Sequence, residues 1–159
     1  MEGYLQMAAE ITDEMSAAPD VVFLQAGVGG LAASLAAHFR AAWGDGPVSV
    51  VVEPEAAPAL IGSVSAGELV DTEGPVSSMG RLDCITPSLV ALEGLARDAD
   101  HFVTISEEEA RNGIHALAEH GFATPPSGGA GLAALLAGVP GCGTNSTVLT
   151  ILSEGPEDG

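Results

Sequence analysis

Three glycines stand close together in the segment Gly27-Val28-Gly29-Gly30. The apolar run 21–24 before them predicts a buried strand, and apolar residues four apart after them predict a helix. Glycine lets the backbone adopt positive φ and approach a ligand closely. The first turn of the following helix presents unpaired N–H groups and a partial positive charge, which suit a phosphate group. A tight turn without a ligand is the alternative, but three glycines in four residues favour a phosphate site.

The spacing of the glycines leaves the identity of the phosphate ligand open. Gly27, Gly29 and Ala32 fit the dinucleotide fingerprint. Glu53 follows the next predicted strand at about the position of a ribose-binding acid. From spacing alone, a nicotinamide cofactor is therefore a fair prediction. A solvated strand end is the more common role of a glutamate at such a position.

Strands alternate with helices along the chain, which predicts an α/β fold with a parallel sheet flanked by helices. Strands are expected at 21–24, 48–52, 101–105 and 147–152, with a further short strand at Leu69-Val70. Helices are expected at 4–15, 31–43, 56–66, from Thr86-Pro87 to Leu95, from Ser106 to Gly121, and at 128–137. We expect a single domain over residues 1–156 and a disordered tail at 157–159.

The charge balance excludes several classes of partner. The chain has 22 acidic and 4 basic residues, a net charge of −18, and no lysine. This balance argues against nucleic-acid binding and against docking on an anionic membrane, but it permits one small anion held by backbone N–H groups. Cys84, Cys142 and the four histidines show no metal-ligand spacing, so we expect no metal site. Without a signal-peptide pattern or a membrane-spanning apolar run, we expect a cytoplasmic protein.

Five segments carry a family resemblance. They are Phe23 to Ala32, Val52-Glu53-Pro54, Gly74 to Ser77 with Met79 to Cys84, Pro126 to Gly131, and Leu149 to Pro156. In this order they resemble fold-type II enzymes that depend on pyridoxal 5′-phosphate (PLP), and most closely the diaminopropionate ammonia-lyase family. The Gly-Arg-Leu-Asp-Cys stretch at 80–84 is the most discriminating segment, because other fold-type II lyases share the glycine loop. The matched segments cover nearly the whole chain, which resembles the C-terminal portion of such an enzyme.

The resemblance implies PLP as the cofactor, a small amino acid as the substrate, and conversion of 2,3-diaminopropionate to pyruvate and ammonia by α,β-elimination. Ser153 matches the hydroxyl that meets the pyridine nitrogen of the cofactor, and a neutral hydroxyl does not force that nitrogen to stay protonated. The segment 127–129 is expected near the active-site face, without a chemical role. The cofactor phosphate is assigned to the loop residues Gly27, Val28, Gly29, Gly30 and Leu31.

No catalytic residue is predicted in this chain. PLP enzymes need a lysine to form the Schiff base, and the family places that lysine in an N-terminal part before the matched region. We therefore expect a truncated C-terminal piece that is inactive alone and exposes an apolar surface. Such a surface favours a homo-oligomer or a complex with a separate N-terminal half. A serine or threonine dehydratase piece, a non-catalytic phosphate-ligand module and a nicotinamide-binding domain are the alternatives.

Overall fold

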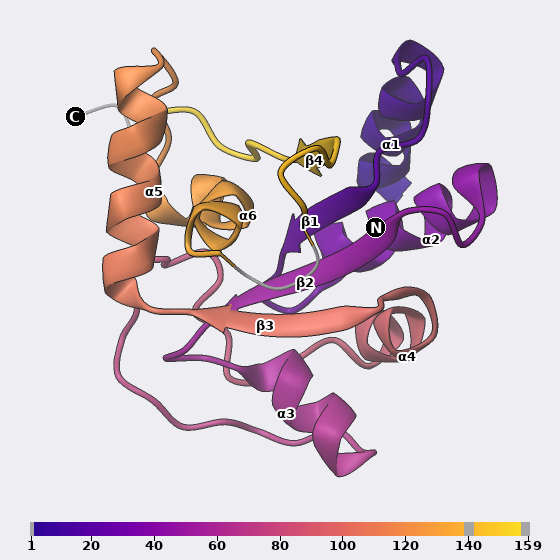
Figure 1. Cartoon of the computed structure of the whole chain (residues 1–159). Coiled ribbons are helices and arrows are strands. Elements are labelled where there is room, and N and C mark those ends of the chain that lie inside the picture. The colour runs from indigo at the N-terminus through magenta and orange to yellow at the C-terminus, as the bar shows by residue number, and fades with distance from the viewer. Residues whose placement is uncertain (1, 139–141, 157–159) are drawn as a thin grey trace.

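The chain forms a four-stranded parallel sheet with helices on both faces (Figure 1). The computed structural model describes residues 2–138 and 142–156, so the tail expected at 157–159 lies outside the described residues. The strands are β1 (Val21–Gln25), β2 (Val48–Pro54), β3 (His101–Ile105) and β4 (Val148–Thr150), in the spatial order β3-β2-β1-β4. The helices are α1 (Glu2–Glu14), α2 (Gly30–Trp43), α3 (Ala59–Ala66), α4 (Leu89–Asp98), α5 (Glu107–Glu119) and α6 (Pro126–Leu136). The predicted α/β class with a parallel sheet is confirmed.

Alternate residues of β1 face two separate apolar clusters. Val22 and Leu24 pack with residues of α1, α2 and α4, whereas Val21 and Phe23 pack with residues of α5 and α6. This alternation is the two-residue period of a strand. Because both faces of the sheet are covered, β1 reads in the sequence as a continuous apolar run.

Helix α2 begins directly at the glycine loop. Gly29 is its N-cap residue and has a φ of 94°, a left-handed conformation that favours glycine. Leu35 and Phe39 are buried beneath the helix, and the Phe39 ring stacks on the Trp43 ring with centroids 4.7 Å apart. The packed face of α2 therefore holds its first turn in a fixed place at the end of β1.

Two local predictions are wrong. Leu69 and Val70 form no strand. The Val70 N–H donates to Ser63 Oγ at 3.1 Å, so its hydrogen bond goes to a side chain of α3 and not to a neighbouring strand. Helix α4 begins at Leu89 and not at Pro87. Ser88 before it stays extended, and the Ser88 N–H donates to the carbonyl of Val28 at 2.9 Å. This last bond ties the start of α4 to the glycine loop.

Helix α5 begins with a capping box. Ser106 Oγ accepts from the Glu109 N–H at 3.2 Å, and the Glu109 carboxylate accepts from the Ser106 N–H at 2.7 Å. Helix α6 begins at Pro126, two residues earlier than expected. In the part of the chain that the structure describes, no helix is both long enough and apolar enough to cross a membrane.

The segment 67–88 between α3 and α4 forms no helix or strand. The Glu107 carboxylate at the start of α5 accepts from Ser77 Oγ at 2.5 Å and from the Ser78 N–H at 3.1 Å. Met79 and Leu82 are buried in the apolar cluster on the α5–α6 side of the sheet. These contacts hold the segment close to the ends of the strands, where Arg81 and Leu82 reach the site described next.

Candidate functional site

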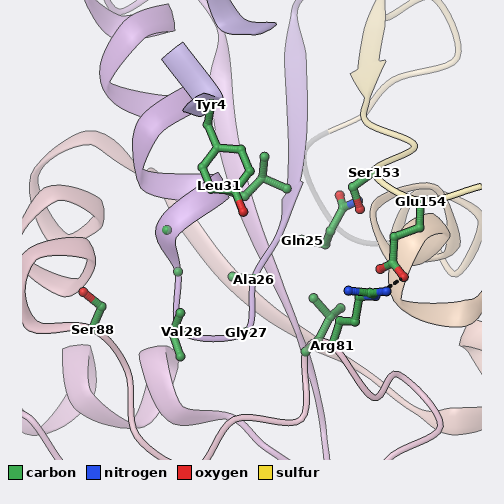
Figure 2. A pocket seen from close by; sticks show the side chains of 13 residues that line it. Tyr4, Gln25, Ala26, Gly27, Val28, Leu31, Arg81, Ser88, Ser153 and Glu154 are labelled. Atoms are coloured by element: carbon green, nitrogen blue, oxygen red, sulfur yellow. Dashed lines mark hydrogen bonds and ion pairs between the residues drawn. The ribbon is translucent and has the colours of Figure 1, made fainter. Parts of the chain in front are cut away.

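A cavity of about 470 Å³ opens where β1 and β4 end. The chain leaves β1 toward β2 on one side, whereas β4 joins the sheet on the other side of β1. The crevice at such a reversal of strand order is the usual ligand site of a parallel α/β sheet. The lining comes from Gln25 to Leu31, from Arg81 and Leu82, from Ser153 and Glu154, and from Tyr4 and Ser88 (Figure 2).

All six residues that the sequence assigned to a cofactor line this one cavity. The loop and the start of α2 form one wall, and Ser153 lies across from them on the segment that follows β4 (Figure 2). The structure thereby brings together residues from opposite ends of the chain. The members of this set are Gly27, Val28, Gly29, Gly30, Leu31 and Ser153.

The first turn of α2 offers backbone N–H groups to this cavity wall. The Ala33 N–H donates to the carbonyl of Gly29 at 2.9 Å, which is the first bond of the helix ladder. Helix geometry therefore leaves the preceding N–H groups, from Gly30 to Ala32, without an acceptor inside the helix. The helix dipole adds a partial positive charge at the same place. The wall is thus suited to an anion even though the chain as a whole is strongly acidic.

The glycine loop is held closely from two sides. A Cβ atom on Gly29 would lie 2.9 Å from the Cβ of Ala91 on α4, and one on Gly27 would lie 2.8 Å from the carbonyl oxygen of Arg81. Neither position has room for a side chain unless the neighbour moves. The Ser88 N–H additionally fixes the carbonyl of Val28. The loop conformation is therefore held by packing against its neighbours and by this hydrogen bond.

Gln25 joins the loop strand to the segment that carries Ser153. Its side chain is buried, and its Nε2 donates to the carbonyls of Ile151 at 2.9 Å and Gly128 at 3.1 Å. The same nitrogen donates to Ser153 Oγ at 3.1 Å. Sequence reasoning missed this residue, because one glutamine at a strand end belongs to no motif. The signal that could have found it is a polar side chain in a wholly buried strand, which needs partners.

Arg81 and Glu154 form an ion pair at the cavity (Figure 2), with Arg81 Nε and Glu154 Oε2 2.6 Å apart. The Arg81 side chain is 77% exposed, whereas that of Glu154 is 16% exposed. An ion pair with so exposed a partner contributes only about 0–1 kcal/mol to stability. It can therefore separate at little cost when a ligand enters.

Glu53 is not a solvated strand end. It is 1% exposed, and its carboxylate accepts from the N–H groups of Leu60 at 2.7 Å and Ile61 at 2.8 Å, at the start of α3. Burial raises the pKa of this carboxyl to about 7, although the bonds from backbone N–H groups act in the opposite direction. Both carboxylate oxygens are engaged by α3. This weakens the nicotinamide reading, which needs the acid for a ribose hydroxyl.

The remaining candidate residues have structural contacts. Cys84 and Cys142 are half-buried free thiols, and burial raises the pKa of Cys142. His38 Nε2 lies 3.1 Å from Thr12 Oγ1, which links α2 to α1. Within residues 2–138 and 142–156, no three His, Cys, Asp or Glu side chains gather in a way that could hold a metal ion.

The sequence matches known proteins over most of its length. Residues 1–154 match the family described as pyridoxal-phosphate dependent enzyme. Diaminopropionate ammonia-lyase from Escherichia coli is 30% identical over 122 residues, which are 74% of this chain and 31% of that protein. The chain therefore spans about a third of the length of this relative.

Solved structures share the fold. The T.th. threonine deaminase has a TM-score of 0.86 and 27% identity, covering 99% of this chain and 57% of that one. Diaminopropionate ammonia-lyase from Escherichia coli has a TM-score of 0.82 and 25% identity, covering 97% and 44%. An L-serine ammonia-lyase from Rhizomucor miehei has a TM-score of 0.85 but 22% identity, which shows the fold alone.

The fold, the cavity at the strand ends and the family match agree. The sheet with its flanking helices is that of fold-type II enzymes, as the resemblance implied. The family match extends over nearly the whole chain. This chain belongs to the family of pyridoxal-phosphate dependent enzymes.

Proposed function

We propose that this chain holds PLP in the cavity between β1 and β4, with the phosphate on the glycine loop and the pyridine nitrogen facing Ser153. One observation carries the proposal. The N–H-rich first turn of α2 and the Ser153 hydroxyl come from opposite ends of the chain and line the same cavity of about 470 Å³. Ligand pockets of this size are usual for small molecules and cofactors.

The residues present fit the cofactor at both of these ends. The backbone N–H groups of residues 30–32 suit a phosphate dianion without help from a lysine. Ser153 is exposed at the cavity and offers a neutral hydroxyl to a ring nitrogen. When bound, PLP supplies an electron sink for chemistry at an amino acid. The part of this chain is to bind and orient the cofactor, because its 159 residues include no lysine for covalent attachment.

The complete enzyme to which this chain contributes is proposed to be an ammonia-lyase. It would convert 2,3-diaminopropionate to pyruvate and ammonia by α,β-elimination. The support is the 30% identity to diaminopropionate ammonia-lyase over 74% of the chain. The chain alone is expected to be inactive, because the chemistry requires a lysine amine that it lacks.

A serine or threonine dehydratase is the second candidate for the complete enzyme. The observation that favours it is the T.th. threonine deaminase, whose structure superimposes with a TM-score of 0.86 at 27% identity. The two candidates share the cavity and its loop. Assays of a complemented enzyme with diaminopropionate, serine and threonine would separate them by the amino acid that is consumed.

A partner is proposed to cover the apolar surface beside the glycine loop. Val28 is 46% exposed, and Ile85, Leu89 and Val90, next to the Ser88 contact, are 60%, 55% and 64% exposed. Apolar surface grouped in this way is typical of association sites. We infer a homo-oligomer or a complex with a separate N-terminal half. A monodisperse monomer in light scattering at all concentrations would contradict the oligomer.

Two further proposals concern the domain organisation and the cellular compartment. We propose that residues 1–156 form one partial PLP-binding domain. The two cysteines are free thiols, which is the usual state in a reducing compartment, and this supports a cytoplasmic location.

Isothermal titration calorimetry with PLP and with NADH tests the proposal. We expect saturable heat from PLP, competition by inorganic phosphate, and no heat from NADH. Binding of NADH without binding of PLP would overturn the proposal in favour of a dinucleotide site. Absence of both would show that this chain does not hold a phosphate ligand in the cavity.

A further inference from the structure

We propose that Gln25 is a positioning residue that fixes the direction of the Ser153 hydroxyl, so that this serine donates a hydrogen bond to the ligand. The inference rests on the proposed function, because the ligand atom concerned is the pyridine nitrogen of PLP. It adds a residue that belongs to no motif of the sequence.

The orientation of the Gln25 amide is set by the backbone around it. The Nε2 atom lies 2.9 Å from the Ile151 carbonyl oxygen and 3.1 Å from the Gly128 carbonyl oxygen. Carbonyl oxygens only accept hydrogen bonds, so the nitrogen and not the oxygen of the amide must face them. Turning the amide over would place Oε1 against two other oxygens. The two carbonyls therefore hold the amide one way round.

A buried orphan atom shows the cost of this arrangement. Gln25 Oε1 is buried and has no hydrogen-bond partner in the described part of the chain. Buried acceptors without a partner are rare because they are unfavourable. In the other orientation Oε1 could accept from Ser153 Oγ, but it would also face the two carbonyl oxygens at 2.9 and 3.1 Å, which an acceptor cannot satisfy. The strand end therefore presents an amide nitrogen, and never the amide oxygen, to Ser153.

The Gln25 nitrogen determines what Ser153 can do. Ser153 Oγ lies 3.1 Å from Nε2, and an amide NH₂ group cannot accept a proton. The serine oxygen must therefore be the acceptor in this contact, sharing the two amide protons with the two carbonyls. The hydroxyl proton then points away from Gln25. Since Ser153 lines the cavity and is exposed there, its O–H is free to donate to a ligand (Figure 2).

A donor at this position selects one form of the ring nitrogen. An unprotonated pyridine nitrogen only accepts hydrogen bonds, whereas a protonated one only donates them. Ser153 held as a donor suits the unprotonated form. An amide oxygen or a carboxylate at residue 25 would accept the serine proton and turn Ser153 into an acceptor, which suits the protonated form. Gln25 thus biases the cofactor toward a moderate electron sink.

Nuclear magnetic resonance with PLP labelled by ¹⁵N at the ring nitrogen tests the inference. The unmodified chain is compared with Gln25→Glu, which presents an acceptor to Ser153, and with Gln25→Met, which presents neither donor nor acceptor. Thr124→Val is the matched control. Thr124 Oγ1 donates to the Glu154 carbonyl at 2.9 Å, so this variant removes an anchor of the same C-terminal segment without touching Ser153.

We expect the unprotonated ¹⁵N signal in the unmodified chain and in Thr124→Val, and a shift toward the protonated signal in Gln25→Glu. The unmodified chain should also prefer PLP over its N-methyl analogue by about tenfold, the worth of one lost hydrogen bond. Gln25→Met should weaken that preference, because the Ser153 hydroxyl is no longer held in one direction, and this holds even if Gln25→Glu fails to fold. An unchanged ¹⁵N signal and an unchanged preference in a folded Gln25 variant would overturn the inference and leave the proposed function standing. Failure of the unmodified chain to bind PLP would overturn both.

Discussion

Gly27 and Arg81 are in direct contact through their backbones: a Cβ atom on Gly27 would lie 2.8 Å from the carbonyl oxygen of Arg81. The glycine loop and the irregular segment 67–88 therefore shape each other. The Gly-Arg-Leu-Asp-Cys stretch stood out in the sequence for its family resemblance. In the fold this stretch packs against the glycine loop at Gly27, and its residues Arg81 and Leu82 also line the cavity.

Gly27→Ala should disturb the glycine loop and the segment 67–88 together. The new methyl group must displace the Arg81 backbone, and overpacking of this kind costs about 1–3 kcal/mol. We expect a lower free energy of unfolding in urea and weaker PLP binding by calorimetry. Gly80→Ala is the control from the same segment, because a Cβ there would meet nothing within 4 Å. If both substitutions lower stability and PLP binding equally, the contact between Gly27 and the Arg81 carbonyl is not the cause.

Gly29→Ala should combine backbone strain with a clash. Gly29 has a φ of 94°, and its added Cβ would lie 2.9 Å from the Cβ of Ala91. Gly67 has a φ of 73° with open space around it, so Gly67→Ala measures the strain alone, about 1 kcal/mol. We expect Gly29→Ala to cost at least about 2 kcal/mol and to abolish PLP binding, while Gly67→Ala leaves binding intact. Loss of binding in both variants would mean that the site does not depend on the loop itself.

Glu107→Ala should loosen the segment that carries Arg81. The Glu107 carboxylate accepts from Ser77 Oγ and from the Ser78 N–H, and losing hydrogen bonds to a charged acceptor costs about 1–3 kcal/mol. We expect a lower midpoint in thermal unfolding and a several-fold weaker PLP affinity. Glu108→Ala changes an exposed neighbour and should stay within about 0.5 kcal/mol of the unmodified chain. If Glu108→Ala lowers stability and PLP affinity as much, the loss of negative charge at the start of α5 is responsible, and not the loss of the Glu107 bonds to Ser77 and Ser78.

Glu53 should make the protein less stable as the pH rises toward neutrality. Burial raises its pKa from the ordinary value of 4.5 to about 7 in the folded state. Below pH 4.5 both states hold the proton. Between pH 4.5 and 7 the unfolded state releases it first, so the contribution of Glu53 to stability falls by about 3 kcal/mol. Free energies of unfolding measured from pH 4.5 to 7.5 should show this fall, and Glu53→Gln should remove it.

Glu109 should change stability with pH in the opposite direction to Glu53. Bonds from the Ser106 backbone and hydroxyl lower the pKa of Glu109, so its contribution is complete above pH 4.5 and is lost as the pH falls through its folded pKa. Glu109→Gln should therefore alter the acid side of the stability profile and leave the slope between pH 4.5 and 7 unchanged. A slope that survives in Glu53→Gln would show that Glu53 is not its source.

The parts of the fold that local patterns govern were predicted well. The apolar run in β1 predicted that strand, because a strand buried on both faces consists mainly of apolar residues. The strand β3 was also predicted, although it lies at the edge of the sheet and is only partly buried. The expected strand 147–152 is shorter in the structure, since β4 pairs with β1 over only three residues. The glycine loop was found because its spacing is itself the signal.

Contacts between distant segments explain what local patterns missed. The Val70 N–H bonds to Ser63 Oγ, and the Ser88 N–H bonds to the Val28 carbonyl. These bonds determine the backbone conformation at both residues, and neither can be predicted from the neighbouring sequence. Glu53 and Gln25 both stand at strand ends, where a polar residue usually meets water. The packing of α3 and α6 over those ends buries them and gives each a structural partner.

Backbone ¹H–¹⁵N spectra recorded while PLP is added test the central claim most directly, because they report on each N–H group separately. The account predicts that the largest shifts fall on residues 27–32 and 153, that inorganic phosphate reproduces the shifts at 27–32 alone, and that NADH produces neither. Shifts confined to other parts of the chain, or no shifts at saturating PLP, would contradict it.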